Sequence, residues 1–315
     1  MELSQLQKDI VELKNQKDVT ILAHYYQELG IQEIADHLGD SLGLSRIAKE
    51  KAKTKYIIFA GVLFMAETAS ILNQDKKILI PSLEACCPLA NFLNRDIVNQ
   101  YRKEYPELPV ITYVNSTAEV KAESDICCTS SNSVNIVKKI SKEFGVDQVL
   151  FGPDKNLAEY VEERTEINVI KIPGKGHCYV HSHLSIDDIQ GVKEDHPSAQ
   201  VLVHPECEKN VRDFADYIGS TAGIYSFVEE HHIDQKEFII GTEKGLLERL
   251  TVDFPRNNFY LASDGLICED MKKNKLETMR MLLKDLDNNR YEVKVPEDIA
   301  EKAYIPIEKM LKFSS

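Results

Sequence analysis

The sequence lacks an apolar run long enough to cross a membrane. Its longest one, YIIFAGVLFMA at 56–66, is far shorter than the roughly 20 residues that a transmembrane helix needs. The N-terminal segment is polar and has the spacing of an amphipathic helix, which distinguishes it from a signal peptide. We therefore expect a cytoplasmic protein that does not insert into membranes.

Positive charge is in short supply. The chain has 38 lysines and arginines against 51 aspartates and glutamates, a net charge of −13 at pH 7. Proteins that bind nucleic acid present a basic face to the phosphates, so this balance argues against nucleic acid as the main partner. The hydrophobic content of 43% and charged content of 28% are ordinary for a globular protein.

Paired metal-binding cysteines are also missing. No CxxC pair occurs, so a zinc site of four thiolates is not supported. The seven cysteines are an odd number in a chain without signs of secretion, so a disulfide framework is not expected. Free cysteine is commonly a small buried hydrophobic residue. We predict that packing role for Cys86, Cys127, Cys128 and Cys207.

The sequence contains an internal threefold repeat. In each copy a strand ends in a polar residue, a hydroxyl residue follows at a predicted helix start, and a second strand and a cysteine come after it at nearly equal intervals. The strand ends are His24, Tyr113 and His204, the hydroxyl residues are Ser41, Ser130 and Ser220-Thr221, and the cysteines are Cys87, Cys178 and Cys268. Repetition over this length indicates duplicated domains, because solenoid repeats are shorter.

Strands alternate with helices in each copy, which predicts an α/β fold with parallel sheets. We expect three pseudo-symmetric αβα domains of three layers around a central active site, at the carboxyl ends of the strands. The predicted copies are 1–87, 88–178 and 179–268, and no flexible linker separates them. The tail, 269–315, is expected to return and pack on the first copy and to end in a helix interrupted near Pro306.

One cysteine per copy would bring three thiolates to a common axis. A [4Fe–4S] cluster normally has four cysteine ligands, and a cluster with three leaves one iron open to act as a Lewis acid. Cys87, Cys178 and Cys268 are therefore candidate cluster ligands. Spacing alone equally allows three equivalent cysteines buried in the cores of the copies, so both interpretations stay open at this point.

The hydroxyl residues at the helix starts also allow two roles. A single one there usually caps its helix, but helix N-termini bind anions as well. Three that face one centre favour a substrate with several carboxylates or phosphates. Acid–base candidates near the strand ends, each of which could instead be structural, are His24, Tyr26, Tyr113, His181, His204 and Glu206. Lys155, Asn156, Glu243 and Lys244 follow strand ends and could also face the centre.

Along nearly its whole length the sequence resembles the quinolinate synthase family. The resemblance is carried by ILAHYYQ, ADHLGDSLGLSR, ACCPLA, TYVNSTAEVKAESDICCTSSN, FGPDKNLAEYV, GHCYVH, VHPECEKNVRDFADYIGST and IIGTEKGLL. It implies a transferase of NAD biosynthesis that condenses iminoaspartate with dihydroxyacetone phosphate to quinolinate, phosphate and water. It also implies three α/β domains around a [4Fe–4S] cluster held by one cysteine of each domain.

The same resemblance assigns roles to individual residues. Cys87, Cys178 and Cys268 would hold the cluster, and the register of Cys-Pro-Leu-Ala favours Cys87 over its neighbour Cys86. The implied substrate-binding residues are His24, Ser41, Tyr113, Asn115, Ser130, His204, Glu206 and Thr221. The implied catalytic residues are Glu206, Tyr26, Tyr113 and His204, with Glu206 as the base that isomerises the triose and Tyr26 as a mobile acid or lid residue.

Two other functions remain open on the sequence. A cluster-dependent hydro-lyase of a small polycarboxylate shares the three-cysteine arrangement, but it needs no triose phosphate. An iron–sulfur sensor or electron carrier does not explain three anion-binding helix starts. If the chain makes quinolinate, an aspartate oxidase or dehydrogenase is the expected source of its iminoaspartate and a functional partner.

Overall fold

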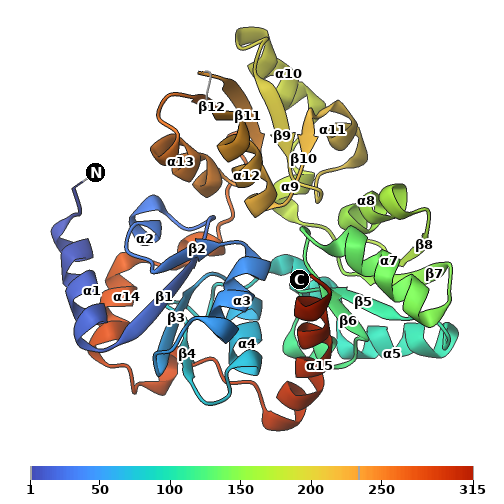
Figure 1. The fold of residues 1–315 in the computed structure, drawn as a ribbon, viewed down its shortest axis with the longest axis horizontal. Coiled ribbons are helices and arrows are strands. Elements are labelled where there is room, and N and C mark those ends of the chain that lie inside the picture. Colours follow the sequence, from blue (N-terminus) through green and yellow to red (C-terminus); the bar gives the residue numbers. More distant parts are fainter. Residues whose placement is uncertain (1, 233–234, 315) are drawn as a thin grey trace.

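The protein, here a computed structural model, is described over residues 2–232 and 235–314. It contains three parallel four-stranded sheets flanked by helices, which confirms the predicted fold class (Figure 1). The strand orders are β2-β1-β3-β4, β6-β5-β7-β8 and β10-β9-β11-β12. The strands are β1 Val19–His24, β2 His37–Gly39, β3 Tyr56–Ala60, β4 Lys77–Leu79, β5 Val110–Tyr113, β6 Ile126–Cys128, β7 Gln148–Gly152, β8 Asn168–Lys171, β9 Gln200–Val203, β10 Tyr217–Ile218, β11 Glu237–Gly241 and β12 Asn258–Leu261.

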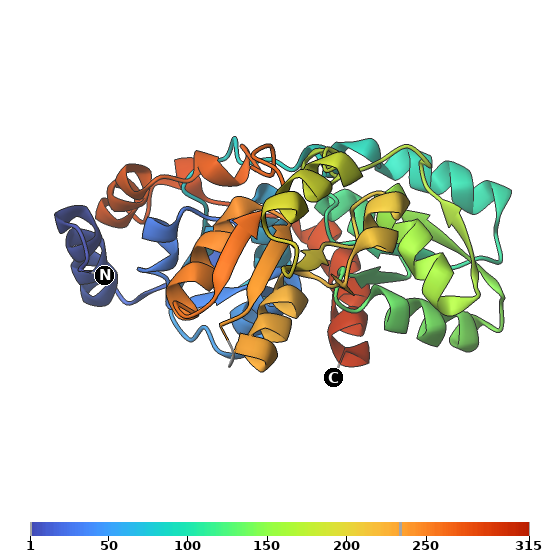
Figure 2. The ribbon, with the colours of Figure 1, turned by 90° about the horizontal axis from the view of Figure 1, so that it is seen from above.

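The helices lie around these sheets, and the three copies form a flat ring (Figures 1 and 2). They are α1 Gln5–Gln16, α2 Leu29–Gln32, α3 Ser41–Glu50, α4 Leu63–Leu72, α5 Arg95–Glu104, α6 Ala118–Ala122, α7 Ser133–Phe144, α8 Lys155–Thr165, α9 Tyr179–Ser182, α10 Ile186–Asp195, α11 Lys209–Phe214, α12 Thr221–His231, α13 Lys244–Asp253, α14 Leu276–Lys284 and α15 Glu297–Phe313. Short 3₁₀ turns cover Pro88–Phe92, Met271–Lys273 and Asn289–Tyr291. Within the described ranges, no helix is both long and apolar enough to span a bilayer.

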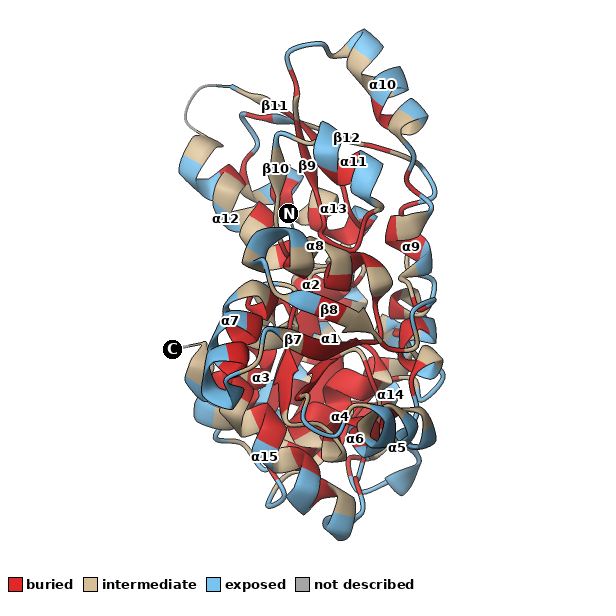
Figure 3. Cartoon of the chain, turned by 90° about the vertical axis from the view of Figure 1, so that its right-hand side faces the viewer, coloured by how far each residue is buried: buried red, intermediate tan, exposed pale blue. Residues whose placement is uncertain are grey.

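Buried residues concentrate in the strands and on the inner helix faces, and exposed residues lie on the outer faces (Figure 3). In each copy an aspartate before the second strand fixes the central strand. Its carboxylate accepts the N–H of a residue in or next to the first strand: Asp36 from Ile21 (2.8 Å), Asp125 from Val110 (2.7 Å) and Asp216 from Val201 (2.7 Å). These contacts set the register of the strands whose ends form the site.

Three buried donors link the copies at equivalent positions. Each hydrogen-bonds to a carbonyl of its own copy and to a carbonyl at a helix start of a neighbouring copy. The contacts are Gln32 Nε2 with Gln27 O (2.9 Å) and Gly245 O (3.0 Å), Lys121 Nζ with Ser116 O (2.8 Å) and Phe64 O (3.3 Å), and Arg212 Nη1 with Cys207 O (2.7 Å) and Asn156 O (3.3 Å). We call Gln32, Lys121 and Arg212 the inter-copy donors. The carbonyl that each donor binds in its own copy belongs to the residue directly after Tyr26, Asn115 or Glu206. The contacts between copies therefore also fix the backbone next to these three residues.

The C-terminal tail lies across two copies. The sequence predicted packing on the first copy, and α14 packs there against α1. Helix α15 also contacts α6 and β6 of the second copy, and the core around it contains residues of both copies. The predicted interruption near Pro306 was wrong, because α15 continues through this residue. Buried neighbours such as Ala303, Ile307 and Met310 anchor the helix on both sides of the proline, which offsets the hydrogen bond it cannot donate.

Candidate active site

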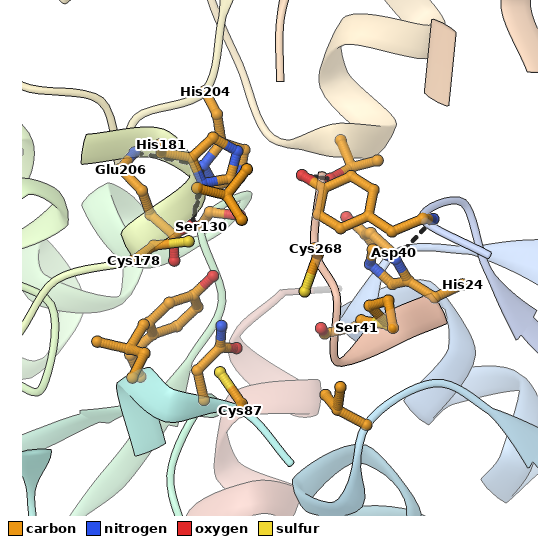
Figure 4. A pocket seen from close by; sticks show the side chains of 18 of the residues that line it. His24, Asp40, Ser41, Cys87, Ser130, Cys178, His181, His204, Glu206 and Cys268 are labelled. Carbon is orange, nitrogen blue, oxygen red and sulfur yellow. Dashed lines mark hydrogen bonds and ion pairs between the residues drawn. The ribbon is translucent and has the colours of Figure 1, made fainter. Parts of the chain in front are cut away.

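A pocket at the centre of the ring is lined by residues of all three copies (Figure 4). It brings together every residue that the sequence assigned to the site: His24, Tyr26, Ser41, Cys87, Tyr113, Asn115, Ser130, Cys178, His204, Glu206, Thr221 and Cys268. The further candidates Lys155, Asn156, Glu243 and Lys244 are not among its lining residues. The described lining residues include no lysine or arginine, so any anion bound here would rely on hydroxyls, imidazoles, backbone N–H groups and metal.

His24 and His204 occupy equivalent places at the ends of the first strands of their copies. In each, Nδ1 accepts the backbone N–H two residues on, from Tyr26 (3.1 Å) and from Glu206 (3.3 Å). An accepting Nδ1 leaves the proton of a neutral imidazole on Nε2. Burial, with Lys272 beside His24 and His181 beside His204, lowers the pKa of both histidines to about 3. Both side chains are therefore neutral hydrogen-bond donors at neutral pH.

Glu206 is buried against two imidazoles. Its Oε2 lies 2.7 Å from Nδ1 of His181 and 3.3 Å from Nδ1 of His204. Burial opposes ionisation, but hydrogen bonds from His181 and Tyr113 favour it, and the pKa of Glu206 is lowered. The carboxylate is thus ionised and faces the pocket.

A chain of polar contacts leads from Glu206 to the first copy. His181 Nε2 lies 2.9 Å from Thr242 Oγ1, and Thr242 Oγ1 lies 2.7 Å from the hydroxyl of Tyr26. The Tyr26 hydroxyl also accepts from Thr221 Oγ1 at 3.0 Å. The contacts therefore connect Tyr26 of the first copy with Glu206 of the third. The sequence proposed His181 as an acid–base group, whereas nothing in it pointed to Thr242.

Of the hydroxyl residues at the helix starts, Ser220 is a helix cap, whereas Ser41 and Thr221 are not. Asp40 caps α3 by accepting the N–H of Gly43 at 2.9 Å, and Ser220 caps α12 by accepting the N–H of Gly223 at 3.1 Å. Ser41 and Thr221 are the first helical residues, and their hydroxyls line the pocket. The sequence did not identify Asp40, although aspartate is a favoured capping residue.

The prediction that a helix begins at Ser130 was wrong. Helix α7 begins at Ser133, with Asn132 as the residue before it. The Asn132 side chain accepts the N–H of Thr129 at 2.7 Å within the turn that precedes the helix. Ser130 lies in this turn and still lines the pocket.

The three cysteines of the pocket have equivalent local structure. Their sulfur atoms point toward the space between them (Figure 4). Burial raises the pKa of Cys87, Cys178 and Cys268, whereas the backbone N–H three residues on, at Ala90, His181 and Met271, acts in the opposite direction on each sulfur. N–H groups aimed at buried sulfur stabilise thiolates, which iron–sulfur clusters require. The three residues therefore fit a cluster.

A single metal ion would use a different set of side chains. Ligand atoms of Cys178, His181 and Glu206 lie within 4.8 Å of one another, and the three cysteines do not form such a set among the described residues. Thiolates around one ion are held at about 2.3 Å from it, so their sulfurs cannot be farther apart than about twice that distance. Cysteine sulfurs that lie farther apart than this suit a cluster better than a single ion. The His181–Glu206 contact of 2.7 Å, moreover, already occupies two atoms of the alternative set.

Comparison with known proteins gives the family. The model of the family described as quinolinate synthetase A protein matches residues 8–312. The chain belongs to this family. Relatives named quinolinate synthase include those of Methanothermobacter thermautotrophicus (46% identical, covering 99% of this chain and 99% of the relative), Clostridium kluyveri (47%, covering 97% of each) and Thermotoga maritima (45%, covering 96% and 98%).

The adjacent cysteines Cys86 and Cys87 differ in environment. Cys87 lines the pocket, whereas Cys86 is partly exposed and its sulfur lies 3.6 Å from the carbonyl oxygen of Leu83. The packing role of Cys86 stays a prediction, because its side chain is only partly buried. Cys127, Cys128 and Cys207 are fully buried, as a packing role predicts.

Proposed function

We propose that this protein is a quinolinate synthase, which condenses iminoaspartate with dihydroxyacetone phosphate to quinolinate, phosphate and water in NAD biosynthesis. Family membership over residues 8–312 supports the assignment. The observation that carries it is a single central pocket that combines one cysteine from each copy, three hydroxyl-bearing turns and a buried carboxylate. The proposed reaction needs such a combination of groups in one place. Both substrates are anions, and the reaction forms carbon–carbon and carbon–nitrogen bonds and also removes water.

The pocket has suitable groups for anionic substrates despite its lack of lysine and arginine. Helices α3 and α12 direct their N-termini to it, where the helix dipole favours negative charge. The hydroxyls of Ser41, Ser130 and Thr221 and the Nε2–H groups of His24 and His204 would bind the carboxylates and the phosphate. Asn115 and Tyr113 would orient the condensing carbons from the second copy.

Cys87, Cys178 and Cys268 would hold a [4Fe–4S] cluster. When bound with one iron open, such a cluster supplies a Lewis acid that assists loss of hydroxide. Hydroxide loss is the step that the remaining polar groups of the pocket are least able to promote, because they lack a strong acid.

The residues of the third copy would move the protons. Isomerising a triose phosphate requires a base next to the carbon that loses its proton. Among the described residues, two carboxylates line the pocket, and Asp40 is used as a helix cap. Ionised Glu206 is therefore the candidate base. His204 and Tyr113 contact or adjoin this carboxylate. Tyr26 would serve as an acid at the opposite side, connected to Glu206 through Thr242 and His181.

An unstable imine must be made close to where it is used. We therefore also propose functional coupling to an enzyme that oxidises aspartate, either a flavin-dependent oxidase or a dehydrogenase. The two enzyme classes deliver the same imine.

The test is product formation by anaerobically purified protein. Iminoaspartate generated in the reaction and dihydroxyacetone phosphate should together yield quinolinate, measured by chromatography. Omitting either substrate should abolish the product, and Glu206→Gln should lower kcat by about 100-fold or more, while Glu208→Gln, at a partly exposed neighbour, should leave it unchanged. Water loss from a polycarboxylate without triose phosphate, and no quinolinate, would instead favour a hydro-lyase.

A further inference from the structure

Two carboxylates outside the pocket contact the backbone of its cysteines. Asp154 and Glu243 immediately precede α8 and α13, and both are fully buried. Asp154 Oδ2 accepts the N–H of Cys178 at 3.0 Å, and Glu243 Oε1 accepts the N–H of Cys268 at 3.2 Å. Each carboxylate thus binds the amide of a residue that would hold the cluster.

The second oxygen of each carboxylate is held by a helix. Asp154 Oδ1 accepts the N–H of Leu157 at 2.7 Å, and Glu243 Oε2 accepts the N–H of Gly245 at 2.7 Å. A carboxylate fixed at both oxygens transmits the position of the helix start to the cysteine backbone. Hydrogen bonds behind the direct ligands commonly set ligand orientation in this way.

The first copy has no counterpart to these carboxylates. The first residues of α4, α8 and α13 donate their N–H groups to the carbonyl two residues before the cysteine: Leu63 to Ala85 (2.7 Å), Lys155 to Gly176 (2.8 Å) and Lys244 to Leu266 (2.9 Å). This shared contact makes Val62 the equivalent of Asp154 and Glu243. Val62 has no polar side chain, and the Cys87 N–H has no acceptor within the described residues.

We infer that Asp154 and Glu243 are positioning residues for the metal cluster, and that they fix Cys178 and Cys268 while Cys87 remains the adjustable ligand. The inference rests on the cluster that we propose above. Loss of either carboxylate leaves the sulfur of its cysteine free to move, and the cluster then dissociates faster. The cysteine thiolates themselves and the pocket residues are unchanged.

The Glu243 contact extends further than that of Asp154. Lys272 Nζ lies 2.8 Å from Glu243 Oε1 and donates to the carbonyl of Tyr26 at 2.6 Å. A change at Glu243 therefore also disturbs the Tyr26 loop. Asp154 has no such lysine partner among the described contacts, so variants at Asp154 give the cleaner test.

The alternative is that Asp154 only caps its helix and has no role at the cluster. The variant Asp154→Ser distinguishes capping from positioning of the cysteine. Serine caps helices as well as aspartate does, but its single side-chain oxygen cannot serve Leu157 and Cys178 together. Glu243→Gln is the second test variant. Asp216→Asn is the matched control, because Asp216 also accepts a backbone N–H, at 2.7 Å, but the donor is Val201 and not a cysteine of the pocket.

The experiment loads each protein with iron and sulfide and follows the decay of cluster absorbance in the presence of an iron chelator. The melting temperature of the metal-free proteins is measured in parallel. We expect Asp154→Ser and Glu243→Gln to lose the cluster about tenfold faster than wild type, whereas Asp216→Asn decays like wild type. Asp154→Ser should melt close to wild type without metal.

Decay of both test variants at the wild-type rate would overturn the inference, and so would equally fast decay of Asp216→Asn, since loss would then follow stability alone. Wild-type protein that takes up no iron at all would refute the proposed cofactor, and with it this inference. If wild type takes up the cluster and every variant loses it as slowly as wild type, this inference fails but the proposed function stands.

Discussion

The Tyr26 hydroxyl lies 2.7 Å from Oγ1 of Thr242, so a side chain of the first copy meets the third copy at the edge of the pocket. Thr242 is fully buried and also contacts His181 Nε2 at 2.9 Å. It therefore joins Tyr26 to the His181–Glu206 pair. Proton transfer across the pocket would depend on this side chain, although Thr242 does not line the pocket itself.

Thr242→Val should lower kcat by about tenfold and change KM little, because valine preserves the shape of the side chain but breaks the link between Tyr26 and His181. Steady-state kinetics of quinolinate formation measures both constants. Thr251→Val is the control, since this hydroxyl contacts only the exposed backbone of its own helix. An unchanged kcat in Thr242→Val would show that the link carries no proton.

Ser41→Ala should raise KM by about tenfold and leave the melting temperature near that of wild type, since Asp40 rather than Ser41 caps α3. Ser220→Ala, at the equivalent helix start, should lower the melting temperature and leave KM near that of wild type. It removes the cap of α12, which costs about 1 kcal/mol of stability. Kinetics and thermal unfolding of the two variants distinguish binding from capping. Lower stability of Ser41→Ala at unchanged KM would contradict the assigned role.

Lys121→Met should destabilise the protein by about 2 kcal/mol in urea unfolding. The variant leaves the carbonyl of Ser116 buried without its donor, and an unpaired buried group is costly. Lys121→Gln should cost less, because Gln32 already serves as the inter-copy donor of the first copy. Lys139→Met is the control, since Lys139 donates to a carbonyl at the exposed surface. Equal stability of Lys121→Met and wild type would mean that this donor does not join the copies.

Acid should destabilise the protein through His24. Its pKa of about 3 in the folded state is lower than the ordinary value of 6.5, since burial and Lys272 outweigh Glu206. The unfolded chain therefore binds the extra proton between these values, and the free energy of unfolding falls as the pH falls through this window. Between pH 7.5 and 5.5 this histidine should account for about 1 kcal/mol of the loss.

His24→Gln removes that contribution. Urea unfolding at the two pH values should show a loss smaller by about 1 kcal/mol in the variant than in wild type. The comparison uses the change with pH within each protein, so the cost of the substitution itself cancels. An identical loss in both proteins would mean that His24 is not held neutral.

The repeat explains why so much of the site could be predicted. Equivalent positions in three copies identified the strand ends, the hydroxyl residues and the cysteines, and parallel topology requires all of them to meet at one edge of each sheet. Residues outside this pattern were harder to identify. Thr242 acts through contacts between the first and third copies, which no single segment reveals. Glu243 was noticed as a polar residue after a strand and Asp154 was not, and the contacts of both with cysteine amides appear only in the folded chain.

Local hydrogen bonds and packing account for the errors. A turn over residues 129–132, in which the Asn132 side chain accepts the Thr129 N–H, precedes α7, which begins three residues beyond Ser130. At Pro306, buried neighbours on both sides override the tendency of proline to end a helix.

Iron and sulfide content after anaerobic reconstitution tests most directly whether the three copies share one metal centre. Wild type and the control Cys86→Ser should each contain about four irons and four sulfides, and Cys87→Ser, Cys178→Ser and Cys268→Ser should each lose them. A wild type without iron and sulfide, or three pocket variants that all keep a full cluster, would contradict a centre built from one cysteine of each copy.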